Sequence, residues 1–388
     1  MASSLERRKR QERIRRKRKK RMIFMIVEII ILCTLSLVAF GMNKMGKLNR
    51  LDIDPTVTNK DLNLEDYTNI ALFGLDAREG EESGVRSDSI IVASIDNKNK
   101  TIRLASVYRD TFLMQKDGTY FKANNAYAAG GPEEAVEMLN KNLDLNITEY
   151  ASVNFKALAD VVNLVGGIKI DLTLEEIGHL NNYSVETSKV TGLSYDPLPP
   201  EAGTYNLDGV QAVSYARIRY TAGGDFKRAE RQRIVLSKIA EKVKKAGIFK
   251  LNKIIDKVLP EVTTSFNMSE ILKMADYMIS YDMGDNQGFP KEVATPDSIP
   301  GYKGSFAVPV NLEYNVKELH KFLFPDEAYT PSETVVSISN EIAYLTDIYV
   351  DEEEFTEDTQ QEDTQQEDTQ QENAQESTED NEDLETGE

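Results

Sequence analysis

Cysteine and histidine are almost absent from this chain. Its 388 residues include one cysteine, Cys33, and two histidines, His179 and His320. One cysteine excludes a disulfide within the chain. Because Cys33 lies in an apolar run, a thiol nucleophile or a cysteine-based zinc site outside that run is excluded too. Two histidines argue against a multi-histidine metal site. Any catalytic metal must then be held by carboxylates, which favours Mg²⁺, Mn²⁺ or Ca²⁺.

Basic residues are missing from the C-terminal end, and acidic residues are scarce at the N-terminal end. Residues 351–388 hold eighteen Asp or Glu and no Lys or Arg, whereas residues 1–21 hold twelve Lys or Arg and two Glu. Outside these two blocks the net charge is −11, against −19 for the whole chain. The part of the chain between these two blocks is therefore acidic, which argues against general nucleic-acid binding, because that needs a basic face.

The only long apolar run covers residues 22–42 and contains one charge, Glu28. As a helix it spans roughly 30 Å, the thickness of the bilayer core. The basic arm at 1–21 precedes it, so the positive-inside rule predicts a cytoplasmic N-terminus and an exported C-terminal bulk. No A-x-A-like cleavage site follows, which indicates an uncleaved signal anchor in the cell membrane. The alternatives are a buried core helix for the run and a nucleic-acid patch for the arm.

The rest of the chain divides into a stalk, a folded domain and a tail. Residues 43–64 are polar and read as a stalk. From about 351 the chain is an acidic low-complexity repeat with EDTQQ three times in register, which cannot bury enough apolar surface to fold and is predicted to be disordered. That leaves a folded domain at about 65–350, with its core at 67–246.

Within that domain short apolar runs alternate with helical patterns. The expected strands lie at 69–75, 89–95, 101–107, 150–155 and 168–172, and the expected helices at 132–143, 156–165, 208–216 and 225–245. This alternation predicts an α/β fold in which a mixed central β-sheet is sandwiched by helices.

Arginines and aspartates gather at the ends of these elements. Asp76 ends the first strand, Asp88 precedes the second and Arg109 with Asp110 follows the third. Pockets of α/β sheets lie at such strand ends. The other members of the set are Arg78, Arg86, Arg217, Arg219, Arg228, Arg231 and Arg233, with Asp225 expected to cap the helix at 225–245.

Two carboxylates and several arginines on one face suggest a metal-bridged polyphosphate. Carboxylates hold a hard cation, and one arginine guanidinium can donate two parallel hydrogen bonds to the oxygens of a phosphate. A helix N-terminus with an arginine in its first turn adds an anion site. The spacing alone leaves a plainer interpretation open, in which these residues form surface salt bridges and a helix cap.

Seven ordered segments resemble the LytR–CpsA–Psr family of cell-wall proteins. They are NIALFGLDAR, RSDSIIVASID, LASVYRDTF, KANNAYAAGG, VNLVGGIKIDL, GTYNLDGVQAVSYARIRY and DFKRAERQR. The resemblance implies a phosphotransferase that takes an anionic glycopolymer, such as teichoic acid or capsule polysaccharide, from an undecaprenyl-pyrophosphate carrier. The polymer is joined to peptidoglycan through a phosphodiester, with Mg²⁺ as cofactor (Mn²⁺ is possible). The implied partners are the glycopolymer carrier, peptidoglycan and the membrane, with no nucleic acid.

Residue by residue, the resemblance assigns a site. Asp76 and Asp88 match the family's metal-associated carboxylates, and either could be the general base. The residues matching pyrophosphate-binding arginines are Arg86, Arg109, Arg217, Arg219 and Arg228. Asp225 lies next to that group and is placed to orient an arginine. Asp76, Asp88, Arg109 and Arg219 are the expected catalytic residues.

The family also implies an apolar tunnel for the polyprenyl chain. The candidate walls are Leu139, Leu143, Val153, Phe155, Leu158, Val161 and Val162, although a packed core has the same sequence pattern. Three other functions stay open: a pyrophosphatase that releases the polymer to water, a non-enzymatic surface binder that uses the acidic tail, and a regulator that uses the basic arm.

Overall fold

The computed structural model describes residues 49–57, 62, 64–76 and 84–349. The basic arm (1–21), the apolar run (22–42) and the acidic tail (351–388) lie outside the described residues. So does Arg78. Within the described ranges no helix combines the length and the apolar character needed to cross a bilayer.

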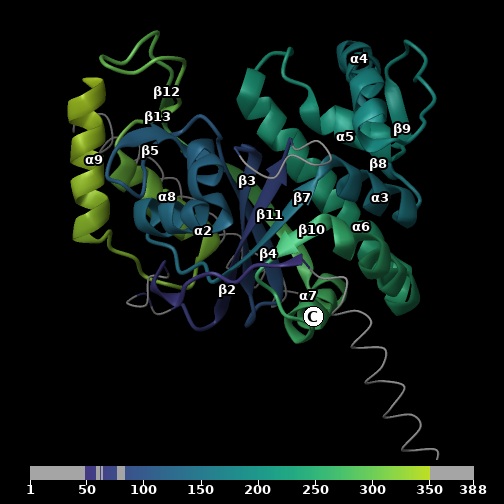
Figure 1. The fold of residues 1–388 in the computed structure, drawn as a ribbon, viewed down its shortest axis with the longest axis horizontal. Coiled ribbons are helices and arrows are strands. Elements are labelled where there is room, and N and C mark those ends of the chain that lie inside the picture. The colour runs from purple at the N-terminus through teal and green to yellow at the C-terminus, as the bar shows by residue number, and fades with distance from the viewer. Residues whose placement is uncertain (1–48, 58–61, 63, 77–83, 350–388) are drawn as a thin grey trace, which may run out of the picture.

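A seven-stranded mixed sheet forms the centre of the domain (Figure 1). Its order is β1-β10-β7-β2-β3-β4-β11. The antiparallel meander β2 (Tyr67–Leu75), β3 (Ser87–Asp96) and β4 (Thr101–Val107) confirms the first three expected strands. β7 runs parallel to β2, and β11 runs parallel to β4. The other strands of the sheet are β1 (Asn49–Arg50), β7 (Glu149–Asn154), β10 (Val262–Thr264) and β11 (Asp282–Phe289).

Helices cover both faces of this sheet, as the alternating pattern predicts (Figure 1). One face carries α2 (Ala123–Leu143), α8 (Leu312–Leu323), α9 (Glu333–Thr346) and the hairpin β5 (Phe112–Met114)–β6 (Tyr120–Lys122). The other carries α3 (Phe155–Val165), α5 (Gly209–Arg217), α6 (Gly224–Val258) and α7 (Met268–Ser280). The remaining elements are α4 (Leu174–Thr191), η1 (Pro55–Val57), η2 (Leu259–Glu261), β8 (Ile168–Leu172), β9 (Gly203–Leu207), β12 (Val293–Ala294) and β13 (Val308–Pro309).

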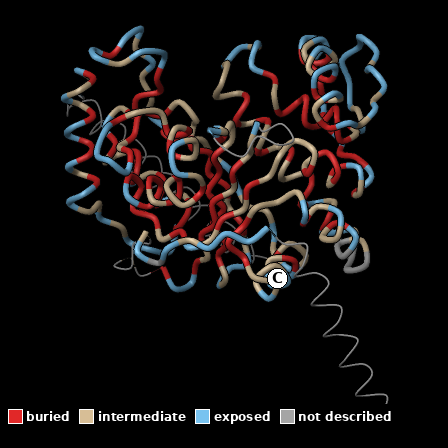
Figure 2. Tube along the Cα trace, viewed as in Figure 1, coloured by how far each residue is buried: buried red, intermediate tan, exposed pale blue. Residues whose placement is uncertain are grey.

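The two faces of the sheet are packed differently. Under α2, α8 and α9 the buried apolar side chains form one continuous cluster that includes Phe73, Val92 and Leu139. Under α3, α5, α6 and α7 they form two separate clusters, one around Ile91 and Leu104 on the sheet and one around Val162 and Val235 on the helices. Figure 2 shows the buried segments concentrated on the inner side of both layers. The divided core leaves room for a pocket on that face.

Several expected boundaries need correction. The helix predicted at 225–245 runs as α6 from Gly224 to Val258, because its apolar positions continue to repeat at helical spacing. The helix predicted at 132–143 is preceded by another helical segment, and Gly130 and Gly131 break the helical geometry between them. The strand at 168–172 forms as β8, but it pairs with β9 in a separate two-stranded sheet.

Part of the expected stalk is not a stalk. Asn49 and Arg50 pair with β10, the Leu51 N–H donates to the carbonyl of Thr264, and Leu64 is buried in the core. The free edge of a sheet presents unpaired N–H and C=O groups. Asn49 and Arg50 pair with the groups at the β10 edge. The described part of 43–64 therefore belongs to the folded domain.

Candidate functional site

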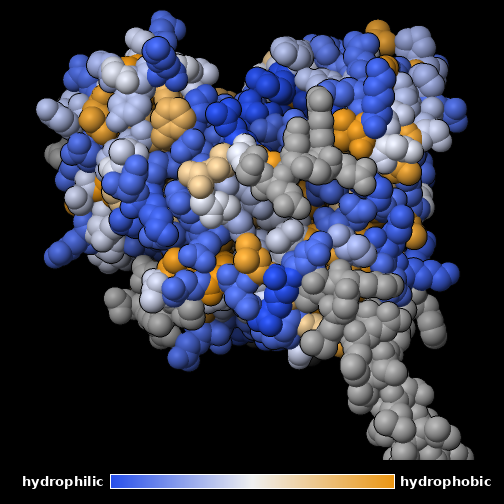
Figure 3. All heavy atoms as spheres, in the orientation of Figure 1, coloured by the Kyte–Doolittle hydropathy of each residue, from blue (hydrophilic) through white to orange (hydrophobic). Residues whose placement is uncertain are grey.

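A pocket of about 270 Å³ lies between the sheet and helices α3, α5 and α6. Its walls are mainly apolar and come from the divided core; they include Leu72, Ile91, Ala151, Val153, Phe155, Leu158, Val213, Ala216, Val235 and Leu236. Its rim carries charged side chains at the ends of strands and helices, namely Asp76, Asp88, Arg217, Arg219 and Arg228. The pocket thus joins an apolar interior to a charged mouth. Hydrophilic residues also gather along the notch in the upper edge of the surface in Figure 3.

A β-bulge places Asp88 at the mouth. The pairing of β2 with β3 shifts between Gly74 and Leu75, so that Gly74 faces Ser89 while Leu75 faces Ser87. The extra residue on the β3 side is Asp88. A Cβ added to Gly74 would lie 2.9 Å from the Cβ of Ser89, so glycine allows the strands to approach here. Bulges redirect a side chain, and this one turns Asp88 out of the ladder.

Arg109 is the centre of the charged cluster. It follows β4, and its Nη1 donates to Oδ1 of Asp88 at 2.8 Å. Its Nε lies 3.4 Å from a carboxylate oxygen of Asp110 and 3.6 Å from one of Asp225. Burial lowers the pKa of Arg109, but the carboxylates around it raise that pKa by more, so the net shift is upward. The guanidinium is a permanent charge held at a fixed place.

The start of α6 supplies the second half of the cluster. Gly223 and Gly224 both have positive φ, which lets the chain turn directly into the helix. Arg228 donates through Nη2 to Asp225 at 3.1 Å and to the backbone carbonyl of Asp88 at 3.2 Å. Burial is the largest effect on Arg228 and lowers its pKa; Asp225 opposes that shift and Arg109 adds to it.

Asp225 does not cap α6, so that expectation is wrong. Gly223 occupies the cap position, and no side chain there bonds to the first turn. Asp225 instead lies one residue inside the helix. Its carboxylate is within 3.8 Å of nitrogens of Arg109, Arg219 and Arg228. These contacts place it beside the arginines, as expected, and its role in orienting one of them stays a prediction.

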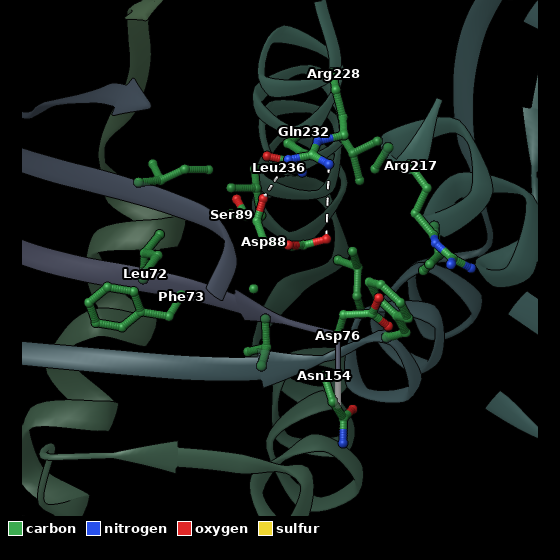
Figure 4. Close-up of a pocket in the computed structure, with 18 of the residues that line it drawn as sticks. Leu72, Phe73, Asp76, Asp88, Ser89, Asn154, Arg217, Arg228, Gln232 and Leu236 are labelled. Carbon is green, nitrogen blue, oxygen red and sulfur yellow. Dashed lines mark hydrogen bonds and ion pairs between the residues drawn. The ribbon is translucent and has the colours of Figure 1, made fainter. Parts of the chain in front are cut away.

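Arg217 lines the pocket but is held by α4. Its Nη1 donates to the hydroxyl of Thr187 at 3.0 Å and its Nη2 to the carboxylate of Glu186 at 2.9 Å. The guanidinium lies over the rings of Phe155 and Tyr183, 4.7 and 5.4 Å from their centroids. In Figure 4 its side chain turns away from Asp88 and Arg228. Arg219 is more exposed, and among the described residues its carboxylate neighbour is Asp225, at 3.8 Å.

The two proposed metal-associated carboxylates differ in their surroundings. Asp76 is exposed and lies beside Asn154 at the ends of β2 and β7, whereas Asp88 points toward Arg228 (Figure 4). Among the described residues no group of three or more His, Cys, Asp or Glu side chains could hold a metal alone. Three polar atoms of the charged cluster are buried without a hydrogen-bond partner, namely Oδ1 of Asp225 and the Nε atoms of Arg109 and Arg228. Oδ1 of Asp225 lies 3.8 Å from Nε of Arg219. This donor set fits a cation whose remaining ligands arrive with a phosphate group, not a complete protein cage.

Some expected residues lie away from the pocket. Arg86 is exposed and is not among the lining residues; it follows residues 77–83, which are outside the described ranges. Arg231 is buried against Glu176, at 3.0 Å, and Arg233 against Asn286, at 2.7 Å. Both side chains therefore fix α6 against neighbouring elements and do not reach the pocket.

Of the candidate tunnel walls, three line the pocket: Val153, Phe155 and Leu158. Leu139 and Leu143 belong to the core on the opposite face of the sheet, and Val161 and Val162 pack in the helical cluster. Leu139 and Leu143 were wrong because α2 covers the face of the sheet away from the pocket, and Val161 and Val162 because they lie on the side of α3 that packs against other helices. The sequence alone does not say which face of a sheet or helix meets the cavity.

Sequence reasoning missed three residues of the site. Gln232 lines the pocket one turn after Arg228, and helical spacing from Arg228 would have found it. Tyr183 reaches the pocket from α4, and Lys122 lies 2.8 Å from Asp110. Neither has a local sequence signal, because both are brought in by distant elements.

Comparison with known proteins agrees with this geometry. The TagV protein of Bacillus subtilis, named a polyisoprenyl-teichoic acid–peptidoglycan teichoic acid transferase, is 33% identical over 218 residues, which are 55% of this chain and 50% of TagV. A transferase of the same name, TagU of Enterococcus faecalis, is 32% identical over 225 residues, 57% of this chain and 69% of TagU. The matched part thus spans between half and about two thirds of these relatives.

The fold is shared with solved structures. Bacillus subtilis TagT with bound octaprenyl pyrophosphate lipid superposes with a TM-score of 0.51 at 20% identity, covering 71% of this chain and 99% of that one. At that identity the likeness is one of fold. The family model described as LytR_cpsA_psr matches residues 37–286, more than half of the sequence. The chain belongs to the LytR_cpsA_psr family.

Proposed function

We propose that this protein is a phosphotransferase that moves an anionic glycopolymer from a polyprenyl-pyrophosphate carrier to peptidoglycan. The observation that carries the proposal is an apolar pocket whose mouth carries Asp88, Arg219 and Arg228. Arg109 and Asp225 do not line the pocket but are ion-paired to these mouth residues. An amphiphile with a hydrocarbon tail and a polyphosphate head has the complementary shape and charge. The names of TagV and TagU and the lipid bound by TagT support the same assignment.

The pocket itself argues for a hydrophobic ligand. Its walls are mainly apolar side chains, and covering apolar surface with a hydrocarbon chain is favourable by roughly 25 cal/mol per Å². Larger side chains at wall positions such as Ala151 and Ala216 would fill part of this space. A protein that leaves such a space in its core forgoes stability, and a bound polyprenyl chain would restore it.

In the proposed reaction a sugar hydroxyl of peptidoglycan attacks the phosphorus that bears the polymer. The new P–O bond forms as the bond to the bridging oxygen breaks, and polyprenyl phosphate leaves. The hydroxyl proton goes to a carboxylate, either Asp76 or Asp88. Arg109 and Arg228 hold their charges beside the mouth, where negative charge builds on the leaving oxygens. Nε of Arg109 faces the carboxylates of Asp110 and Asp225, whereas Nε of Arg228 is buried without a hydrogen-bond partner.

We also propose that the reaction depends on Mg²⁺, held by Asp76 and Asp88 with the diphosphate completing its shell. A bound Mg²⁺ neutralises phosphate charge as a Lewis acid. A membrane anchor at 22–42, with the described domain outside the cell, would place the pocket next to its lipid donor. That part of the proposal rests on the apolar run and the basic arm before it.

The decisive test is the identity of the lipid that purifies with the full-length protein in detergent. Mass spectrometry of the wild type and Arg109→Ala should show a polyprenyl phosphate or pyrophosphate in the first and much less in the second. Incubation with a polymer-linked carrier and peptidoglycan should then yield a polymer–peptidoglycan phosphodiester. Free polymer with no peptidoglycan adduct would identify a pyrophosphatase instead, and the absence of any polyprenyl lipid would refute the donor assignment.

A further inference from the structure

Arg217 is set apart from the other arginines of the mouth by what holds it. Arg109 and Arg228 bind the carboxylates of the cluster directly, whereas the contacts of Arg217 come from α4 and α3. Its side chain is 15% exposed, and its guanidinium rests on the faces of Phe155 and Tyr183. Two aromatic faces fix the plane of the guanidinium, and the hydrogen bonds at its edge fix its rotation within that plane.

Arg217 makes two side-chain hydrogen bonds, one to Thr187 and one to Glu186, and the bond to Thr187 is the buried one. Thr187 is fully buried, and so are Ser184 and Ser214 beside it. The Ser214 hydroxyl oxygen lies 3.1 Å from the Thr187 hydroxyl oxygen and 3.1 Å from that of Ser184. The chain of hydroxyls ends on the backbone carbonyls of Leu180 and Val210. It occupies the interface of α4 and α5, where apolar packing would be the default.

Arginine has no acceptor atom, so the direction of the last link is fixed. Arg217 donates, and the Thr187 oxygen accepts. A fully buried acceptor has no water to replace a lost partner, so the pairing holds the guanidinium firmly. The partner on the other side, Glu186, is 52% exposed, and such surface ion pairs contribute little. The N–H groups of Arg217 that neither residue uses remain available to a ligand in the pocket.

We propose that Thr187 is a positioning residue of the site, which acts through Arg217 and is itself held by Ser214 and Ser184. The inference rests on the proposed function, and on the expectation from the family resemblance that Arg217, which lines the pocket, binds the diphosphate of the lipid carrier. Without the Thr187 hydroxyl the guanidinium keeps its charge, its aromatic supports and the exposed bond to Glu186, but it loses its buried hydrogen bond. Misplacement of a binding group by about 1 Å is enough to cost on the order of 100-fold in rate.

Equilibrium binding of octaprenyl pyrophosphate to the full-length protein in detergent tests this. Thr187→Val removes the hydroxyl at nearly constant volume, and Thr187→Ser restores it. Thr191→Val is the matched control: Thr191 is also buried in α4, but its hydroxyl donates to the Thr187 backbone carbonyl and does not touch Arg217. Thermal unfolding of each variant is recorded beside the binding curve, and Thr187→Ala replaces Thr187→Val if the latter shows no folding transition.

We expect Thr187→Val and Arg217→Ala each to weaken binding on the order of tenfold, because loss of a bond to a charged group costs about that much. Thr187→Ser and Thr191→Val should bind within about twofold of the wild type, although Thr191→Val loses similar stability. If Arg217→Ala weakens binding while Thr187→Val binds normally, Thr187 has only a structural role and the inference is wrong. If the wild type binds no octaprenyl pyrophosphate, the proposed function itself fails, and the inference fails with it.

Discussion

Nη1 of Arg109 lies 2.8 Å from Oδ1 of Asp88, and this contact joins the end of β4 to the start of β3 at the mouth of the pocket. Both side chains are largely buried, at 15% and 29% exposure. A buried charge pair of this kind fixes the position of both charges before any ligand arrives. Loss of Arg109 should therefore reduce the rate of transfer more than it reduces the free energy of unfolding.

Arg109→Ala should lower kcat/KM for polymer transfer by about 100-fold or more, since a preorganised charge beside the leaving oxygens is lost. Arg103→Ala is the matched control. Arg103 lies on β4, the strand that Arg109 follows. It pairs with Asp96 at 3.5 Å near the other end of β4, and its side chain is 19% exposed. Transfer assays and thermal unfolding of both variants separate the two effects. Equal losses of activity in the two variants would show that Arg109 matters only for folding.

The apolar pocket gives a second prediction. Ala216→Leu places extra methyl groups in the cavity, so its thermal unfolding temperature should stay level or rise, while binding of octaprenyl pyrophosphate falls at least about tenfold. Ala212 lies one turn earlier on α5 in packed core, and Ala212→Leu should lower stability by about 1–3 kcal/mol through overpacking. Ala216→Leu protein that keeps wild-type affinity would show that the lipid binds elsewhere.

Much of this architecture could be predicted from local pattern. The strands β2, β3 and β4 are apolar runs bounded by polar turns, and their burial in the centre of the sheet is the reason for that pattern. Asp76, Asp88 and Arg109 were found because they end or begin those strands. Strand ends on one edge of a sheet meet in space whatever the rest of the chain does.

Features decided by distant partners could not be predicted. β11 reads DMGDNQGF, with no alternation of apolar residues, and is a strand because it pairs with β4 along its length. Asp225 looked like a helix cap, but α6 begins one residue earlier, and its carboxylate pairs with Arg228 on the same helix and with Arg109 and Arg219 from outside it. Arg217 faces α4 because Glu186 and Thr187, about thirty residues earlier, bind it.

The proposed metal makes a third prediction. Chelation by EDTA should abolish transfer, and added Mg²⁺ should restore it. Asp76→Asn should need on the order of tenfold more Mg²⁺ for half-maximal activity, because a weakened ligand set lowers metal affinity. Asp117→Asn, in the turn between β5 and β6, is the control and should need no more than the wild type. Transfer that persists in EDTA would rule out the metal.

A buried histidine makes the fourth prediction. His320 is 2% exposed, its Nε2 lies 2.9 Å from the carbonyl of Leu143, and its ring stacks on Tyr329 at 3.5 Å. Burial lowers its pKa to about 4, while the Leu143 carbonyl and the nearby Asp144 oppose that shift. The folded protein therefore keeps His320 neutral at a pH where the unfolded chain protonates it.

The sign of the effect follows. Between pH about 6.5 and about 4 the unfolded chain binds more protons at this residue, so stability falls as the pH falls. Across that window the loss amounts to roughly 3 kcal/mol. His320→Gln cannot titrate but can still donate to the Leu143 carbonyl. Urea unfolding at pH 7, 5.5 and 4.5 should therefore show a steeper loss in the wild type than in this variant. Parallel curves would mean that the ring is already charged in the folded protein or is accessible to water.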